Sequence, residues 1–152
     1  MNILIVYATN SGGTQIASQS IQEVLTGKTH TVVVKQAAQT SPPELGQYDL
    51  VILGSPSWDY ESQEGLPHAD FIDLIKKCQG TAFEGKKFAV FGLGDSSYTH
   101  FCGAVNHLEE FVTSVKGTKS GESLKIDGFY FNQEKNTELI RSWTEGLSQT
   151  LV

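Results

Sequence analysis

The chain of 152 residues is long enough to bury a core of its own, and we expect residues 1–152 to form one domain. Hydrophobic residues at 39% and charged residues at 18% exclude a disordered chain, and no apolar run approaches the ~20 residues that a membrane-spanning helix needs. The net charge of −6 argues against a nucleic-acid partner, and the first apolar run has no basic segment before it, which argues against a signal peptide.

Short apolar runs alternate with helical patterns along the chain. Runs typical of strands buried on both faces occur at residues 2–7, 31–34, 49–54 and 88–92, with a weaker run at 124–126. The helical patterns comprise Ile16, Ser20, Val24 and Leu25, followed by residues 66–78, 101–115 and 134–151. This alternation predicts a mostly parallel sheet covered by helices on both faces. Ligands of such sheets bind beyond the carboxyl ends of the strands, so the loops after strands one, three and four are the candidate functional segments.

The first of these loops has the composition of a phosphate site. Residues 8–14 read Ala-Thr-Asn-Ser-Gly-Gly-Thr and lead into the first predicted helix. Backbone N–H groups of small residues and the positive end of a helix attract a phosphate, and Thr9, Ser11 and Thr14 add hydroxyls. The loop lacks the lysine of a nucleoside-triphosphate loop and the GxGxxG spacing of a dinucleotide site. An uncharged cradle suits a single phosphate monoester, although an ordinary capped helix start has a similar composition.

The second and third loops each contain an aromatic residue. Trp58 follows the third predicted strand, and Tyr98 follows the fourth. Aromatics at two adjacent strand ends can enclose a planar ring, and each stacked pair contributes roughly 0.5–1.5 kcal/mol beyond area burial. Either residue alone is equally well explained as a cap of the core. Both together, beside a phosphate cradle, favour a ligand with a ring and a phosphate.

Carboxylates surround these aromatics where cations are absent. The chain has no Lys or Arg at residues 36–75 or 88–115. The nearby acids are Asp59, Glu61, Glu64, Asp70, Asp73 and Asp95. A carboxylate ~10 Å from an anionic reduced ring raises its energy by about 1.7 kcal/mol at an effective dielectric of ~20. We therefore expect a strongly reducing ring and an acidic face that docks a basic protein partner.

Three segments closely resemble motifs of the short-chain flavodoxins. Residues 9–14 resemble the family's phosphate motif (S/T)-x-T-G-x-T, and residues 57–59 resemble its tryptophan loop. The most specific match is residues 92–105, Gly-Leu-Gly-Asp-Ser-Ser-Tyr-Thr-His-Phe-Cys-Gly-Ala-Val. The likeness spans essentially the whole chain, including residues 124–128, and leaves no room for the insertion that marks the last strand of long-chain members. It implies a three-layer α/β sandwich with a five-stranded parallel sheet in the order 2-1-3-4-5 and helices on both faces.

The resemblance also implies the cofactor and the function. Members carry low-potential single electrons on non-covalently bound FMN, largely between its semiquinone and hydroquinone states. Their partners are NADP reductase-type donors and electron-accepting enzymes, and they have no substrate of their own. We expect such a carrier here, as a monomer. Residues 9–14 should hold the phosphate, with Trp58 on the inner and Tyr98 on the outer face of the flavin. The expected FMN-binding residues are Thr9, Asn10, Ser11, Gly12, Gly13, Thr14, Ser57, Trp58, Asp59, Tyr60, Leu93, Gly94, Asp95, Tyr98, His100, Phe101 and Cys102.

A few of these positions depart from the family pattern. Asn10 and Ser11 replace common threonines but remain polar, and Gly13 replaces a frequent asparagine. Asp59 stands where several members have glycine. In the family, the peptide after that position turns its carbonyl toward flavin N5 when the semiquinone forms. A side chain makes a positive φ costlier, so we expect the semiquinone to be less stabilised here than in glycine-bearing relatives.

Other functions fit the sequence less well. An NAD(P)H-dependent quinone or flavin reductase of the same fold needs a second nucleotide site with cations, where this chain has acids. A phospho-acceptor receiver domain needs acids after the first strand and an aspartate at the end of the third, where Ala8, Thr9 and Ser55 stand. A degenerate domain without flavin is at odds with the intact aromatics and cradle.

The histidines and cysteines show no catalytic or metal-binding pattern. We expect His68, His100 and His107 to face solvent or to make local hydrogen bonds rather than to catalyse. Cys78 and Cys102 have no metal-ligand spacing, so reduced thiols, no metal site and a cytoplasmic location are expected.

Overall fold

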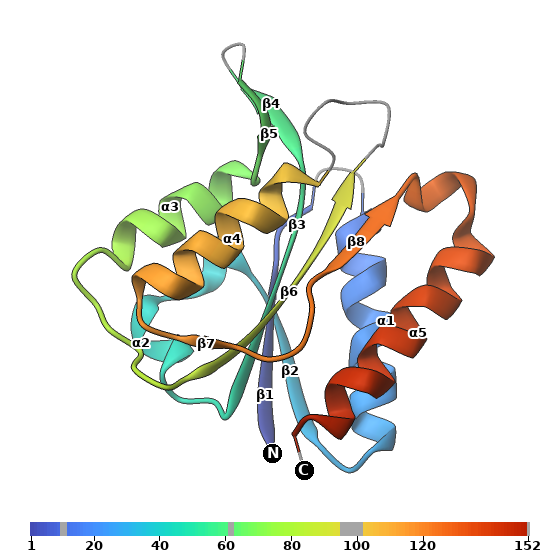
Figure 1. Cartoon of the computed structure of the whole chain (residues 1–152), viewed down its shortest axis with the longest axis horizontal. Coiled ribbons are helices and arrows are strands. Elements are labelled where there is room, and N and C mark those ends of the chain that lie inside the picture. Colours follow the sequence, from blue (N-terminus) through green and yellow to red (C-terminus); the bar gives the residue numbers. More distant parts are fainter. Residues whose placement is uncertain (10–11, 61–62, 95–101, 152) are drawn as a thin grey trace.

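One parallel sheet organises the chain. The computed structural model describes residues 1–9, 12–60, 63–94 and 102–151. In this described part the sheet runs in the order β2-β1-β3-β6-β7, and β8 also pairs with β6 (Figure 1). Its strands are β1 (Asn2–Tyr7), β2 (Thr31–Gln36), β3 (Leu50–Pro56), β6 (Lys87–Gly94), β7 (Thr118–Lys119) and β8 (Leu124–Asp127). The predicted order 2-1-3-4-5 is confirmed, but the fifth strand consists of two short segments, β7 and β8, that pair with opposite ends of β6.

The central strands are continuous apolar runs because both of their faces are covered. On β1, Leu4 and Val6 belong to the core on one side of the sheet, whereas Ile3 and Ile5 belong to the core on the other. Successive side chains of a strand point to opposite faces, so a strand between two helical layers needs apolar residues at every position.

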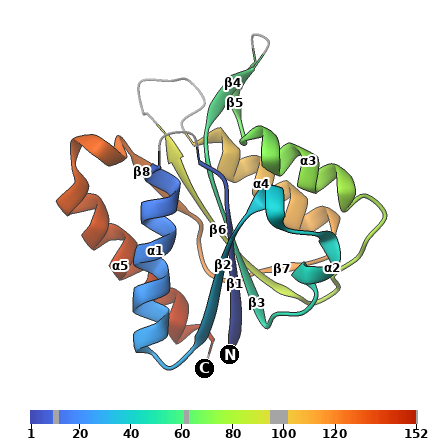
Figure 2. The same ribbon diagram turned by 180° about the vertical axis from the view of Figure 1, so that it is seen from behind.

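Helices cover both faces of this sheet, as predicted. Helices α1 (Gly13–Gly27) and α5 (Gln133–Gln149) lie on one face, and α3 (Ala69–Lys77) and α4 (Gly103–Ser114) lie on the other (Figures 1 and 2). A short helix, α2 (Pro42–Leu45), adds the buried Leu45 to the core beneath α3 and α4. No helix in the described part of the chain is long and apolar enough to cross a membrane.

The buried face of helix α1 agrees only in part with the predicted pattern, because Leu25 is buried and Ile16 is not. Ile16 is 43% exposed, and the buried residues are Gly13, Thr14, Ala17, Ser18, Ile21 and Leu25. The prediction followed the larger apolar side chains. The real contact face has small residues in its first turns, because α1 packs closely against both the sheet and α5 there.

A small hairpin stands above the sheet and was not predicted. Strands β4 (Trp58–Tyr60) and β5 (Gln63–Leu66) pair antiparallel directly after β3. Because Leu66 belongs to β5, α3 begins at Ala69 rather than at Leu66. The helix predicted at 101–115 begins at Gly103. The strands of the hairpin have only three and four residues, Trp-Asp-Tyr and Gln-Glu-Gly-Leu, which is too short for an alternating pattern to stand out in the sequence.

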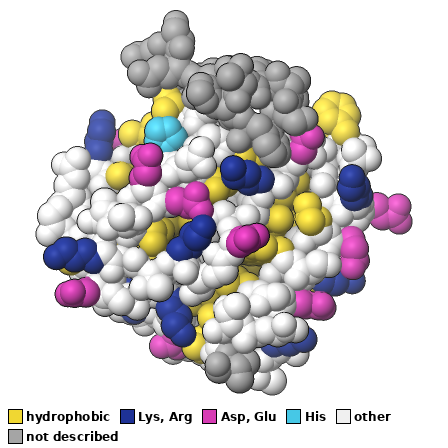
Figure 3. Space-filling view, viewed as in Figure 1, with side chains coloured by type: hydrophobic (Ala, Val, Ile, Leu, Met, Phe, Trp, Pro, Cys, Tyr) yellow, Lys and Arg dark blue, Asp and Glu magenta, His cyan; other side chains and the backbone are white. Residues whose placement is uncertain are grey.

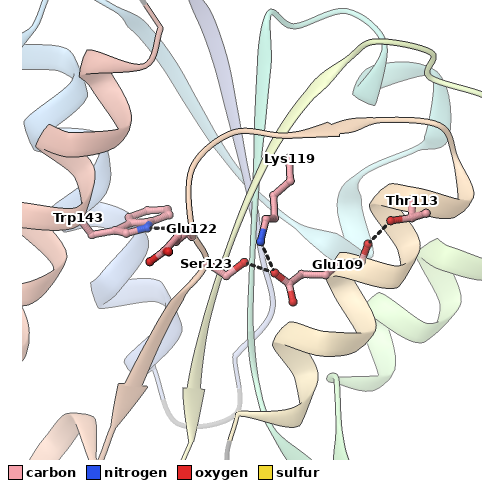
Figure 4. A network of polar contacts seen from close by, with 6 residues as sticks. All are labelled: Glu109, Thr113, Lys119, Glu122, Ser123 and Trp143. Carbon is pink, nitrogen blue, oxygen red and sulfur yellow. Dashed lines mark hydrogen bonds and ion pairs between the residues drawn. The ribbon is translucent and has the colours of Figure 1, made fainter.

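The fifth strand is interrupted at residues 120–123, and a network of polar contacts holds this short segment in place. Lys119 Nζ and Ser123 Oγ each donate a hydrogen bond of 2.7 Å to the same carboxylate oxygen of Glu109 on α4 (Figure 4). On the other side, the indole N–H of Trp143 on α5 donates to the backbone carbonyl of Glu122 at 2.8 Å. The connection between β7 and β8 is therefore tied to a helix on each face of the sheet, and no long insertion interrupts it.

The Glu109 carboxyl is the charged centre of this network. Partial burial acts to raise its pKa, but the hydrogen bonds from Lys119 and Ser123, with the charges of Lys119 and Lys125, outweigh burial and hold the pKa below its ordinary value of 4.5. A carboxyl with a lowered folded-state pKa stabilises the fold at neutral pH. That contribution is lost as the pH falls from 4.5 through the lower folded-state value.

We expect Glu109→Gln to lower the free energy of unfolding of the apoprotein by about 1 kcal/mol at pH 7, because a charge-assisted contact becomes a neutral one. Below pH 4.5 the difference from wild type should shrink. Urea denaturation at several pH values measures both. Glu110→Gln, which removes the same charge from the exposed neighbour on α4, is the control. Equal effects of the two substitutions at pH 7 would contradict the assignment.

Candidate functional site

The carboxyl ends of β1, β3 and β6 meet at one edge of the sheet, opposite both termini (Figure 1). The backbone pairing continues past the strands at this edge. Ala8 N donates to Gly54 O at 3.1 Å, Ser57 N to Leu93 O at 2.9 Å, and Gly128 N to Gly94 O at 3.0 Å. The first residues after β1, β3 and β8 are thus each bonded to the end of a neighbouring strand.

The first loop ends in a backbone cradle at the start of α1. Gly12 is the N-cap residue with φ +90°, a left-handed conformation that side chains disfavour, and its N–H donates to Thr9 Oγ1 at 2.8 Å. The first turn contains no acidic residue, and Gly12 has no side chain to cap the helix. The N–H groups of Gly13, Thr14 and Gln15 have no hydrogen-bond partner among the described residues. A helix start with open donors fits a phosphate.

An aromatic residue that the sequence analysis missed lies beside this cradle. A Cβ placed on Gly12 would lie 3.6 Å from the Tyr130 hydroxyl, and one on Gly13 would lie 3.0 Å from Leu93 Cδ2 and 3.5 Å from the Tyr130 ring. Tyr130 is half-exposed and meets Phe129 edge-on, with ring centroids 5.4 Å apart. The sequence could have indicated Tyr130 by its place four residues after the last predicted strand, whose carboxyl end reaches the same edge.

Ser57 marks the start of the β4–β5 hairpin, and its hydroxyl is engaged within the protein. Ser57 Oγ accepts a hydrogen bond of 3.1 Å from the backbone N–H of Ala104 in the first turn of α4. His68 closes the base of the hairpin: its N–H donates to Ser55 Oγ at 3.0 Å, and its Nδ1 accepts from Asp70 N at 3.0 Å as the cap of α3. The expectation that His68 makes local hydrogen bonds is confirmed.

Cys102 is a buried thiol at the junction of β6, β8 and α4. Burial raises the pKa of this thiol to about 12. Its Sγ lies 3.7 Å from Gly92 O and 3.8 Å from Ile126 O, at the ends of the two strands. The residue has φ +51° and is the N-cap of α4. Cys78 is likewise buried with a raised pKa, and both cysteines are free, as expected. A protonated, enclosed thiol is suited to holding backbone in place rather than to redox or nucleophilic chemistry.

The described structure brings together part of the predicted site. Thr9, Gly12, Gly13, Thr14, Ser57, Leu93, Gly94 and Cys102 all lie at the edge just described. For Trp58, Asp59 and Tyr60 the structure describes the backbone of β4 only. Asn10, Ser11, Asp95, Tyr98, His100 and Phe101 lie outside the described residues. The roles of all these residues toward a ligand remain predictions.

Comparison with known proteins identifies the family. The flavodoxin family model matches residues 5–143. A flavodoxin of Maridesulfovibrio salexigens is 36% identical over 149 residues, which cover 97% of each chain. The crystal structure of oxidised flavodoxin 2 from Bacillus cereus has a TM-score of 0.88 at 30% identity and covers 98% of this chain and 99% of its own. An FMN-bound flavodoxin of Fusobacterium nucleatum shares the fold, with a TM-score of 0.83, 20% identity and 97% of each chain covered. The chain therefore belongs to the flavodoxin family, the FMN-binding proteins that transfer electrons without a substrate of their own.

Proposed function

We propose that this chain forms one domain that binds FMN at the carboxyl edge of its sheet and shuttles single, low-potential electrons between protein partners. The observation that supports this most directly is the uncharged cradle at Gly12. A phosphate monoester held there by backbone N–H groups keeps its negative charge next to the positive end of α1. Binding of the phosphate in this way requires no lysine or arginine, and the chain has neither before Lys28.

The residues divide into three groups around the flavin. Residues 9–14 hold the phosphate, Trp58 and Tyr98 enclose the ring, and the backbone near Asp95, His100 and Cys102 hydrogen-bonds its pyrimidine edge. Bound FMN supplies the one-electron chemistry. The chain's own part is to bind the ring, shield it from water and surround it with carboxylates that keep its potential low. Asp70 and Asp73 of this acidic group lie on α3, where Asp70 occupies the first turn.

The docking partner that we propose is a redox protein with a basic face, and the carrier acts as a cytoplasmic monomer. The support is the run of acids without cations from Asp59 to Glu64 and at Asp95. Elsewhere the charges are mixed: on the face seen in Figure 3, acidic and basic side chains are interspersed below the upper edge. Attraction would thus come from the edge that holds the flavin, which brings the partner's own redox centre close to the ring.

Gly12→Ala tests the phosphate cradle. Alanine at φ +90° costs roughly 1–2 kcal/mol, so the loop either strains or leaves this conformation. We expect the dissociation constant of FMN to rise about tenfold while that of riboflavin, which lacks the phosphate, changes little. Fluorescence titration of the apoprotein measures both. Gly27→Ala at the other end of α1, where a Cβ meets nothing within 4 Å, is the matched control. Equal losses for the two ligands would overturn the assignment.

Asp59→Gly tests the redox role of the hairpin. The β4–β5 register shifts between Trp58 and Tyr60, so Asp59 occupies an irregular position of the strand. Glycine there lowers the cost of a peptide reorientation on reduction. We expect the first one-electron midpoint potential to rise relative to the second in a spectroelectrochemical titration. Asp59→Ala removes the same charge without the glycine, and identical potentials for the two variants would refute the prediction.

Stopped-flow reduction tests the electron-carrier function. NADPH alone should not reduce the FMN-loaded protein rapidly, whereas NADPH with a catalytic amount of an NADP-dependent flavodoxin reductase should. We expect the second-order rate with the reductase to fall about tenfold between low and high ionic strength, because docking depends on opposite charges. Rapid direct reduction by NADPH would instead indicate a reductase. A rate independent of salt would contradict the basic partner.

A further inference from the structure

The start of α4 is capped by a residue from another part of the chain. The helix's own N-cap, Cys102, makes no side-chain capping hydrogen bond, and its first turn contains no acidic residue. The N–H of Ala104, the second residue of the helix, donates instead to Ser57 Oγ at 3.1 Å. This N–H is one that a serine N-cap normally satisfies locally. Ser57, 47 residues earlier in the sequence, replaces that local cap.

A second contact joins the same two elements. Gly103, the first residue of α4, is buried, and a Cβ added to it would lie 2.5 Å from Gly65 O and 2.8 Å from Gly65 Cα. The backbone of β5 therefore rests directly on the first turn of α4, at a distance that only glycine permits. In Figure 1 the base of the hairpin lies beside the start of α4.

We propose that Ser57 is a positioning residue for the flavin ring, which it serves by locking the β4–β5 hairpin onto α4. Trp58 follows Ser57 directly, and Tyr98 stands five residues before Gly103, the first residue of α4. The hydrogen bond and the backbone contact therefore hold the start of the hairpin against the start of α4 in the apoprotein. These two points anchor the segments proposed to bind the ring, one with Trp58 and the other with Tyr98. The flavin then binds to anchors that are already placed, which lowers the entropy lost on binding. This inference rests on the proposed function.

The lock predicts a distinct pattern of ligand affinities. Ser57→Ala leaves the buried Ala104 N–H without its acceptor, and Gly103→Ala forces β5 away from the helix. Both changes act on the ring-binding side of the edge and leave the Gly12 cradle intact. Riboflavin and FMN should therefore lose affinity by the same factor, about tenfold. Gly12→Ala, by contrast, should weaken FMN alone.

The experiment is a fluorescence titration of each apoprotein with riboflavin and with FMN, at a temperature where circular dichroism shows every variant folded. Ser57→Thr, which keeps the hydroxyl, should restore wild-type affinity for both ligands. Ser114→Ala, which removes a serine hydroxyl from the other end of α4, and Gly146→Ala, which adds a methyl group to a helical glycine in open space, are the controls and should match wild type. The one-electron potentials of FMN-loaded Ser57→Ala should also shift, a change that loss of stability alone does not produce.

The outcomes separate this inference from the function itself. If wild-type protein binds FMN but Ser57→Ala and Gly103→Ala retain its affinities for both ligands and its potentials, the lock is refuted and the carrier function stands. Loss of FMN affinity without loss of riboflavin affinity in Ser57→Ala also refutes it, because the hydroxyl would then serve the phosphate. If wild-type apoprotein binds neither ligand, the proposed function is itself refuted, and the lock with it.

Discussion

Burial of β1, β3 and β6 on both faces is the constraint on which the rest of the structure depends. Three parallel strands with apolar side chains on both faces need a helical layer on each face. The connection from one parallel strand to the next then crosses over a face of the sheet. Their carboxyl ends must consequently converge on one edge, where Ala8, Ser57 and Gly128 extend the pairing beyond the strands. The site is built from segments that share this edge and are otherwise distant in sequence.

We propose that the protein binds the phosphate group at that edge through backbone N–H groups, where many nucleotide-binding proteins use a charged side chain. The cradle at Gly12 offers N–H groups and a helix dipole, and neither adds a full positive charge close to the ring. A lysine there would attract the phosphate more strongly but would also favour the reduced anion, which opposes a low potential. In the proposed site, binding by dipoles separates the affinity for the phosphate from the electrostatics of the ring.

Local signals predicted the elements of the fold, and non-local contacts decided the details. The apolar runs located all four long strands, because a buried parallel strand has a composition that few other elements share. The predicted pattern of α1 included the buried Leu25 but missed the small residues Gly13, Ala17 and Ser18, which are weakly hydrophobic although they are buried. The candidate site was predicted as a set of loops at one edge of the sheet, and the roles of its residues toward a ligand remain predictions. The bond from Ala104 to Ser57 and the place of Tyr130 depend on chain segments that only the folded sheet brings together.

The divided fifth strand has a consequence for how this molecule behaves in a crowded solution. An outer strand of a sheet exposes unpaired N–H and C=O groups that can recruit the outer strand of another copy, the first step of fibril growth. Here that border offers only two residues in β7 and four in β8, and the network around Glu109 occupies the gap between them. The border on this side is therefore short and interrupted, which leaves few backbone groups in register for the outer strand of another copy.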